Sequence, residues 1–310
     1  MNLSRRVTLR QLEVFVEAAR QLNFSRVGET LHPTQPAVSM QIRQLEEAVG
    51  MALFDKVGKR KVLTDAGTLL LRHASRLLGE LNDAEQSLLA LKGLAGGSIT
   101  VGLVSTAKYF APKLLAMFSR EHPGVEVRFS VGNREALVQW LRENQIDLAL
   151  MGRPPGELDT VSEPLAENPN VLAAPPGHRL AGVARFDLLE LRGDTFLQRE
   201  EGSGTRQMMQ ELFRAHLFKP QRLITMGSNE TIKQAVMAGL GVSLLSLHTL
   251  SLELRGGEIA LLHADGLPLM RTWNVVHAQR RQLSPAAAAF RRFLIEQTHP
   301  YLQGAFGKLI

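Results

Sequence analysis

F-S-R-V-G-E-T-L-H-P-T-Q-P-A-V-S-M-Q-I-R-Q-L-E-E-A-V-G-M-A-L-F, from Phe24 to Phe54, predicts two helices joined by a tight turn. Ser25 is expected to cap the first helix, because its hydroxyl can accept a bond from an early free backbone N–H. His32 and Pro33 are expected to end that helix, since proline disfavours helical geometry in the residue before it.

The second helix of this stretch is predicted to begin after Thr34, with Pro36 in its first turn, where a missing N–H costs nothing. Apolar residues at helical spacing predict a buried face made of Val38, Ile42, Leu45 and Val49. The opposite face carries Gln35, Ser39, Gln41 and Arg43, whose groups suit base edges and phosphates. The pattern favours a helix-turn-helix that enters a DNA major groove, although a small helical hairpin without a ligand is an alternative.

Three ordered motifs resemble those of the LysR-type transcriptional regulators. They are T-Q-P-A-V-S-x-Q-I-x-x-L-E at Thr34–Glu46, G-x-x-L-F at Gly50–Phe54 and L-T-x-A-G at Leu63–Gly67. Within that family, residues 199–206 (R-E-x-G-S-G-T-R) and 228–246 (S-N-E-T-I-K-Q-A-V-M-A-G-L-G-V-S-L-L-S) look most like the regulators of Calvin-cycle (RuBisCO operon) genes. One departure is Val27-Gly28, where the family usually has Ala-Ala; the glycine should loosen the first helix by about 1 kcal/mol.

A basic hairpin, Asp55–Leu63, follows the two helices and is expected to act as the wing of a winged helix-turn-helix. Its cations are predicted to hold phosphates or the adjacent minor groove, which positions the domain without reading sequence. Residues 1–61 hold ten of the 36 Lys/Arg and six of the 30 Asp/Glu, so they carry +4 of the net charge of +6. The residues expected to contact DNA are Ser25, Arg26, Thr34, Gln35, Pro36, Ser39, Gln41, Arg43, Lys59, Arg60 and Lys61.

Two helices flank this domain in the sequence. Thr8–Gln21 predicts a helix with a Thr8/Gln11 capping box and an inner face of Leu9, Leu12, Phe15, Val16 and Ala19. Thr64 is expected to cap a long linker helix that runs to about Lys92. Its apolar residues alternate spacings of four and three, the seam of a coiled coil: Leu70, Ala74, Leu77, Leu81, Ala84, Leu88 and Leu91. We expect Leu70, Leu77, Leu81 and Leu88 to pair two copies, unless the helix belongs to the core of the next domain.

The second half alternates strand and helix patterns after a predicted hinge at Gly93–Gly97, which favours an α/β fold with parallel strands. Strands are expected at 99–104, 125–131, 147–151, 171–174, 196–198, 223–226, 242–245 and 273–278, and helices at 112–122, 133–144, from about 204, 229–238 and 285–296. The resemblance implies a two-lobed, periplasmic-binding-protein-like effector domain with crossings near Glu163–Pro169 and Gly266–Leu269. The expected domains are 1–63, 64–92 and 97–310, with lobe I at about 97–166 and 269–300 and lobe II at about 167–268. The tail Tyr301–Ile310 shows no pattern and is expected to be flexible.

Three loops are predicted to meet at the carboxyl ends of strands, where helix starts offer free N–H groups to an anion. The residues expected to bind a small anionic, possibly phosphorylated, effector are Ser105, Thr106, Lys108, Asn133, Arg134, Glu201, Ser203, Thr205 and Arg206. The alternative is that Ser105, Asn133 and Thr205 only cap helices.

Composition and motifs argue against other classes of protein. The chain has 310 residues, no cysteine and 45% hydrophobic residues, so we expect about two cytoplasmic domains without disulfides. The sequence shows no membrane span, secretory signal, metal-ligand spacing, Walker A loop or placed catalytic base, so neither cofactor nor catalysis is expected.

The prediction is therefore a LysR-type regulator whose partners are promoter DNA, a second copy or a tetramer, a metabolite and RNA polymerase. By resemblance it activates carbon-fixation genes. The alternatives are a regulator of another operon, a solute-binding receptor and an enzyme.

Overall fold

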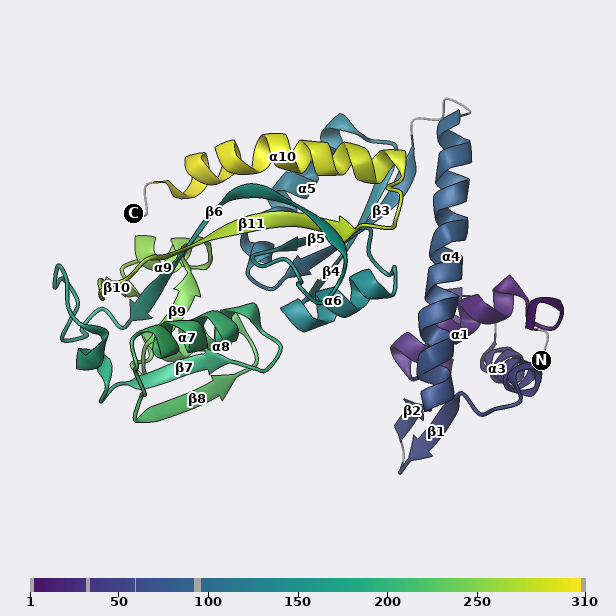
Figure 1. Cartoon of the computed structure of the whole chain (residues 1–310), viewed down its shortest axis with the longest axis horizontal. Helices are drawn as coiled ribbons and strands as arrows, with labels where there is room; N and C mark the ends of the chain where they lie inside the picture. Colours follow the sequence, from purple (N-terminus) through teal and green to yellow (C-terminus); the bar gives the residue numbers. More distant parts are fainter. Residues whose placement is uncertain (1–2, 32–33, 59, 92–95, 308–310) are drawn as a thin grey trace. The chain divides into compact units, whose positions relative to one another are not determined.

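The computed structural model describes residues 3–31, 34–58, 60–91 and 96–307. The chain divides into two compact units, one made of Met1–Leu88 with Glu143–Gln145 and the other of Leu89–Arg142 with Ile146–Ile310. Figure 1 labels the elements of each unit. Among the described helices, none has the length and apolar character needed to cross a bilayer.

The amino-terminal unit is a small helical core with a two-stranded wing. Its elements are η1 (Leu3–Arg5), α1 (Leu9–Gln21), α2 (Phe24–Leu31), α3 (Gln35–Val49), β1 (Phe54–Val57), β2 (Arg60–Leu63) and α4 (Asp65–Leu91). The predicted Thr8/Gln11 capping box is present. Leu12, Phe15, Val16 and Ala19 are buried as predicted. Leu9 was predicted wrongly: it is 48% exposed, because it is the first helical residue and lies outside the packed face.

The first helix of the helix-turn-helix begins at Phe24, two residues earlier than a cap at Ser25 predicts. Asn23 is the cap, since its Oδ1 accepts bonds from the backbone N–H groups of Ser25 (3.1 Å) and Arg26 (3.5 Å). Ser25 therefore lies inside α2 and does not cap it. The earlier start places the Phe24 ring in the core, 5.3 Å from the ring of Phe54. His32 and Pro33, predicted to end α2, lie outside the described residues.

Helix α3 agrees with most of its prediction. Thr34 occupies the cap position, but its side chain makes no capping bond, while Pro36 lies in the first turn. The predicted inner face is buried over its whole length: Val38, Ile42, Leu45 and Val49. The polar face is thereby held outward by the apolar face that packs against α1 and α2.

The motif residues after α3 tie the wing to the helices. Glu46 Oε1 accepts bonds from the backbone N–H groups of Leu53 (2.8 Å) and Phe54 (3.3 Å). Thr64 donates its hydroxyl to the carbonyl of Ala52 (2.7 Å) and caps α4 by accepting from the N–H of Gly67 (3.0 Å). A Cβ at Gly67 would lie 2.1 Å from the carbonyl oxygen of Leu53, so only glycine fits this approach.

The residues of the predicted coiled-coil seam of α4 fall into two groups, one buried within the chain and one exposed. Leu70 and Ala74 pack into the core of the amino-terminal unit, together with Leu71 and Leu78. Further along the helix Leu77, Leu81 and Leu88 are 56%, 49% and 61% exposed. The start of the seam therefore anchors the helix within its own chain, and the later leucines remain uncovered in a single copy.

Lobe I of the carboxy-terminal unit is built on a mixed sheet. Its elements are β3 (Gly97–Val104), η2 (Ala107–Tyr109), α5 (Ala111–Glu121), β4 (Val125–Gly132), α6 (Arg134–Arg142), β5 (Leu148–Met151) and α10 (Pro285–Phe306). Strands β4 and β5 pair in parallel with β3, as predicted. Strand β11 (Leu269–Ala278) returns from lobe II, as predicted, and pairs antiparallel with β5, so the sheet as a whole is mixed.

Lobe II contains β7 (Thr195–Arg199), α7 (Gly204–Ala215), β8 (Arg222–Met226), α8 (Asn229–Met237), β9 (Ser243–Ser246), α9 (Ser251–Arg255) and β10 (Ala260–Leu262), with short turns η3 (Leu188–Leu191) and η4 (Leu247–Thr249). Strand β7 is parallel to β8. Two apolar clusters form the core of lobe II. One includes Phe196, Met209 and Phe218, and the other includes Ile232 and Val236.

Two long strands join the lobes (Figure 1). Strand β6 (Thr160–Ala174) pairs antiparallel with β11, in a register from Leu269 opposite Asn170 to Ala278 opposite Thr160. The crossing expected at Glu163–Pro169 is therefore the middle of one 15-residue strand. The second crossing was expected at Gly266–Leu269, and its last residue, Leu269, is the first residue of β11. Of the predicted hinge at Gly93–Gly97, only residues 96 and 97 are described.

The carboxyl end of the chain is helical further than predicted. Helix α10 continues from the expected end near Glu296 to Phe306, so a flexible tail from Tyr301 is wrong for residues up to 306. Leu302 and Phe306 are buried, and the Phe306 ring lies 4.9 Å from the ring of His248. The burial of Leu302 and Phe306 stabilises the additional turns at the carboxyl end of α10.

His248 should make the stability of this unit depend on pH. Burial lowers its pKa from 6.5 to about 4, and its Nδ1 accepts a bond from Trp273 Nε1 (3.2 Å). Between these values the unfolded chain binds the extra proton, so stability falls as pH decreases through this window, by about 3 kcal/mol in total. Urea unfolding at several pH values should show a steeper loss for the wild type than for His248→Gln, which does not titrate. Equal slopes would contradict the assignment.

Candidate functional site

The outer face of α3 offers exposed polar groups at its amino end. Gln35, Pro36 and Arg43 are exposed, and the Arg43 side chain, 83% exposed, has only a 3.5 Å contact with Glu47. Gln35 Nε2 donates to the Ser39 hydroxyl (3.3 Å). This face can present forked donors to a groove.

The other residues predicted to contact DNA differ in how far their side chains are exposed. Thr34, Ser25 and Arg26 are exposed, whereas Gln41 is half-buried with its Oε1 enclosed. In the wing, the Lys61 ammonium lies 3.0 Å from the centre of the Phe24 ring, and burial followed by repulsion from Lys56 lowers its pKa. Lys61 therefore turns toward the core rather than outward as expected. Lys59 and the side chain of Arg60 lie outside the described residues.

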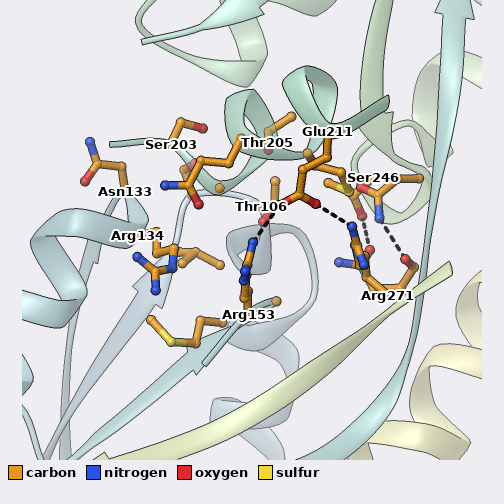
Figure 2. Close-up of a pocket in the computed structure, with 18 residues that line it drawn as sticks. Thr106, Asn133, Arg134, Arg153, Ser203, Thr205, Glu211, Ser246 and Arg271 are labelled. Carbon is orange, nitrogen blue, oxygen red and sulfur yellow. Dashed lines mark hydrogen bonds and ion pairs between the residues drawn. The ribbon is translucent and has the colours of Figure 1, made fainter. Parts of the chain in front are cut away.

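A cavity of about 70 Å³ opens between the lobes of the carboxy-terminal unit (Figure 2). Since one water needs roughly 10–15 Å³ measured in this way, it can hold a ligand of a few heavy atoms. Its lining comprises Val104, Ser105, Thr106, Asn133, Arg134, Met151, Gly152, Arg153, Asn168, Asn170, Ser203, Gly204, Thr205, Gln207, Met208, Glu211, Ser246 and Arg271.

The three predicted loops meet at this cavity. Ser105 and Thr106 follow β3, Asn133 follows β4, and Ser203 and Thr205 lie at the start of α7. Asn133 is a helix cap, because its Oδ1 accepts from the N–H of Ala136 (3.0 Å). Ser203 is not a side-chain cap, although it occupies that position and is 3% exposed. Its hydroxyl and the helix start are thus available to a ligand.

Three arginines and one acid give the lining an excess of positive charge. Arg134 binds Glu157 through two bonds of 2.9 and 3.1 Å, and these lower the pKa of Glu157 to about 2. Arg153 and Arg271 instead share Glu211, which lies between them in Figure 2. The cavity is consequently suited to an anion.

Three residues predicted for the effector site do not line the cavity. Lys108 points to Glu230, with its Nζ 2.8 Å from Oε1. Arg206 and Glu201 pair with each other at 3.3 Å, outside the lining. Sequence placed all three in the correct loops, but side-chain direction within a loop depends on the neighbouring lobe.

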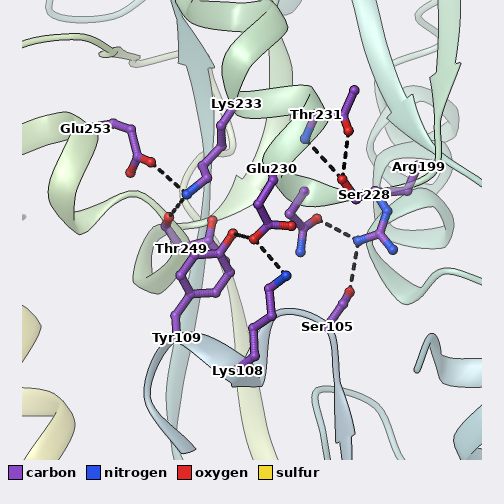
Figure 3. Close-up of polar contacts among 11 residues, drawn as sticks. Ser105, Lys108, Tyr109, Arg199, Ser228, Glu230, Thr231, Lys233, Thr249 and Glu253 are labelled. Carbon is purple, nitrogen blue, oxygen red and sulfur yellow. Dashed lines mark hydrogen bonds and ion pairs between the residues drawn. The ribbon is translucent and has the colours of Figure 1, made fainter. Parts of the chain in front are cut away.

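Polar contacts that include the lining residue Ser105 cross from lobe I to lobe II (Figure 3). Arg199, 3% exposed, donates from Nη1 to the Ser105 hydroxyl (3.0 Å) and to Asn229 Oδ1 (2.6 Å). Tyr109 and Lys108 both bind Glu230 at the start of α8. Because Ser105 also lines the cavity, a ligand there contacts a residue that holds the lobes together.

More than half of the lining residues were not predicted from the sequence. Arg153 follows a predicted strand, so the rule that sites gather at strand ends could have found it. Asn168, Asn170 and Arg271 lie on the crossing strands, whose pairing no local pattern reveals. Within the described ranges no group of three His, Asp or Glu side chains is placed to hold a metal ion.

Two family models match the chain over both units. Residues 9–68 match the bacterial regulatory helix-turn-helix protein, lysR family, and residues 92–299 match the LysR substrate binding domain. The chain belongs to the LysR family of DNA-binding transcriptional regulators, a family without enzymatic activity.

Individual relatives show which regulators within the LysR family this chain is similar to. The chain is 58% identical to the HTH-type transcriptional regulator CfxR of Cupriavidus necator, over 99% of this chain and 96% of that protein. It is 46% identical to the RuBisCO operon transcriptional regulator of Allochromatium vinosum, over 94% and 96%. The regulatory domain of Synechocystis PCC6803 CcmR in complex with 2-PG superposes with a TM-score of 0.63, at 38% identity, over 65% of this chain and 97% of that domain. The chain is thus a homologue of the Calvin-cycle operon regulators.

Arg43→Ala should weaken specific DNA binding by about 1–3 kcal/mol, because it removes a forked donor from the exposed face of α3. A gel-shift titration at fixed ionic strength measures the change. Arg120→Ala, which removes an exposed arginine from α5, is the control and should bind as the wild type. An unchanged affinity for Arg43→Ala would remove Arg43 from the reading face.

Proposed function

We propose that this regulator activates carbon-fixation genes in response to a small phosphorylated carboxylate that binds between the lobes. The observation that carries the proposal is the cavity itself, with its arginines and the start of α7 directed to one small space. The structure of the CcmR regulatory domain in complex with 2-PG supports the same ligand class, and the identity to CfxR and to a RuBisCO operon regulator supports the target genes.

The proposed DNA contacts are Gln35, Pro36, Ser39 and Arg43 on α3 for base edges and phosphates. The wing contributes positive charge near the backbone. Lys61 has a smaller part than expected from sequence, because its ammonium already lies over Phe24. Phosphate contacts of this kind add affinity that decreases with salt.

The ligand would act through the contacts that cross between the lobes. A ligand changes a conformational equilibrium only by its differential affinity for the two states. In this chain the differential contact is at Ser105, which faces the cavity and also accepts a bond from Arg199 of lobe II. Binding therefore favours one arrangement of the lobes, and by linkage one affinity for DNA.

We further propose that α4 pairs two chains through its uncovered leucines, and that RNA polymerase is contacted by the assembled regulator. A dimer presents two α3 helices to a near-palindromic site. Four chains would be assembled through pairing of the effector domains.

Addition of 2-phosphoglycolate should raise the melting temperature of the protein, since a ligand of the folded state stabilises it by about 2.7 kcal/mol at a concentration of 100 times Kd. Differential scanning fluorimetry measures the shift, with glycolate as the unphosphorylated control. Thr106→Val should reduce the shift, and Thr68→Val on α4 should retain it. No shift with any phosphorylated carboxylate would contradict the proposed ligand class.

The double substitution Leu77→Asp and Leu81→Asp should convert the dimer to monomer, because charged groups in a coiled-coil seam are desolvated without partners. Sedimentation velocity reports the mass. Leu69→Asp is the matched control: Leu69 is 51% exposed on the same helix but lies away from the seam. A dimer that persists in the double variant would refute the seam.

A further inference from the structure

Glu211 occupies a particular position in the cavity. Its Oε1 lies 2.7 Å from Arg153 Nη1, and its Oε2 lies 2.7 Å from Arg271 Nη2. Each oxygen of one carboxylate is thus bound by a different arginine, as Figure 2 shows. Two guanidinium groups that converge on the oxygens of one anion are also the geometry that binds a phosphate.

The three residues are distant in the sequence and lie close together only because the two lobes face each other. Glu211 lies on α7 of lobe II, Arg153 follows β5 of lobe I, and Arg271 lies on the crossing strand β11. All three line the cavity. A contact of Glu211 with both arginines therefore connects the lobes while it occupies the side chains best suited to an anionic ligand.

The contact is weak enough to exchange. The side chains of Arg153, Arg271 and Glu211 are 64%, 45% and 32% exposed. Ion pairs with this exposure contribute about 0–1 kcal/mol each, because water and salt screen them. A ligand with more negative charge than one carboxylate can compete for the same donors at small cost.

We propose that Glu211 is an internal stand-in for the anionic group of the effector, and that the effector binds by displacing it from Arg153 and Arg271. This inference rests on the proposed function of the cavity. Because the incoming group must displace a carboxylate, Glu211 lowers the affinity of the cavity for anions, and its repulsion grows with the charge of the incoming group. Glu211 thus sets the affinity for the effector, and its release breaks a contact between the lobes.

The test compares anion binding by the full-length wild type and by Glu211→Gln, which keeps the shape of the side chain and removes its charge. Isothermal titration calorimetry with 2-phosphoglycolate should give a Kd about 5- to 30-fold lower for the variant, the effect of losing two exposed ion pairs. The matched control is Glu126→Gln, since Glu126 pairs with Arg128 on β4 outside the cavity lining and its loss should leave the Kd unchanged. Arg153→Gln and Arg271→Gln should each weaken binding.

The charge dependence is tested with one ligand at two charges. The phosphoryl group of 2-phosphoglycolate has a pKa near 6, so it changes from a dianion to a monoanion between about pH 7.5 and about pH 5. Because ionised Glu211 repels the dianion more than the monoanion, affinity should fall more steeply over this interval for Glu211→Gln than for the wild type. Parallel pH profiles would contradict a Glu211 carboxylate beside the bound group.

The outcomes separate the two proposals. If the wild type binds 2-phosphoglycolate and Glu211→Gln binds it no more tightly, the stand-in role is wrong and the ligand class stands. If Glu211→Gln gains affinity for inorganic phosphate without any preference for 2-phosphoglycolate, the stand-in role holds and the proposed effector is wrong. If neither protein binds either anion, both are wrong.

Discussion

The antiparallel pairing of β6 with β11 is the constraint on which the cavity between the lobes depends. These strands pass through both lobes, with one shift of register between Trp273 and Asn274, so they fix which strand ends and helix starts face each other. Backbone hydrogen bonds buried in a sheet are costly to break, because the freed groups lose water as well as their partner. The pairing of β6 with β11 therefore holds the lining residues of the two lobes in place.

Charge within the cavity is balanced on one side and exchangeable on the other. Arg134 is 13% exposed and is held by two bonds to Glu157, which balances its charge and fixes its position. Arg153 and Arg271 are more exposed and share one carboxylate, so two positive charges face one negative charge on that side. This division supports the proposal that an anion exchanges with the carboxylate of Glu211.

In the amino-terminal unit, contacts around α3 hold its polar face outward. Glu46 and Thr64 bind backbone groups at both ends of the connection between α3 and the wing, and Gly67 allows α4 to approach Leu53. Glu46, Thr64 and Gly67, which belong to the family motifs, thus have a structural role. Beyond this core Leu77, Leu81 and Leu88 of α4 are exposed.

Local pattern was sufficient for much of this protein. Helical spacing identified the buried face of α3, the capping box identified the start of α1, and ordered motifs identified the family, because these features depend on residues within a few positions of each other. The length of α10, the direction of β11 and the inward turn of Lys61 were decided by burial against distant segments. The same holds for Glu211, whose partners are 58 and 60 residues away. Sequence determined which loops reach the cavity, whereas the tertiary structure decided which side chains in them line it, because side-chain direction depends on contacts between lobes that no local periodicity contains.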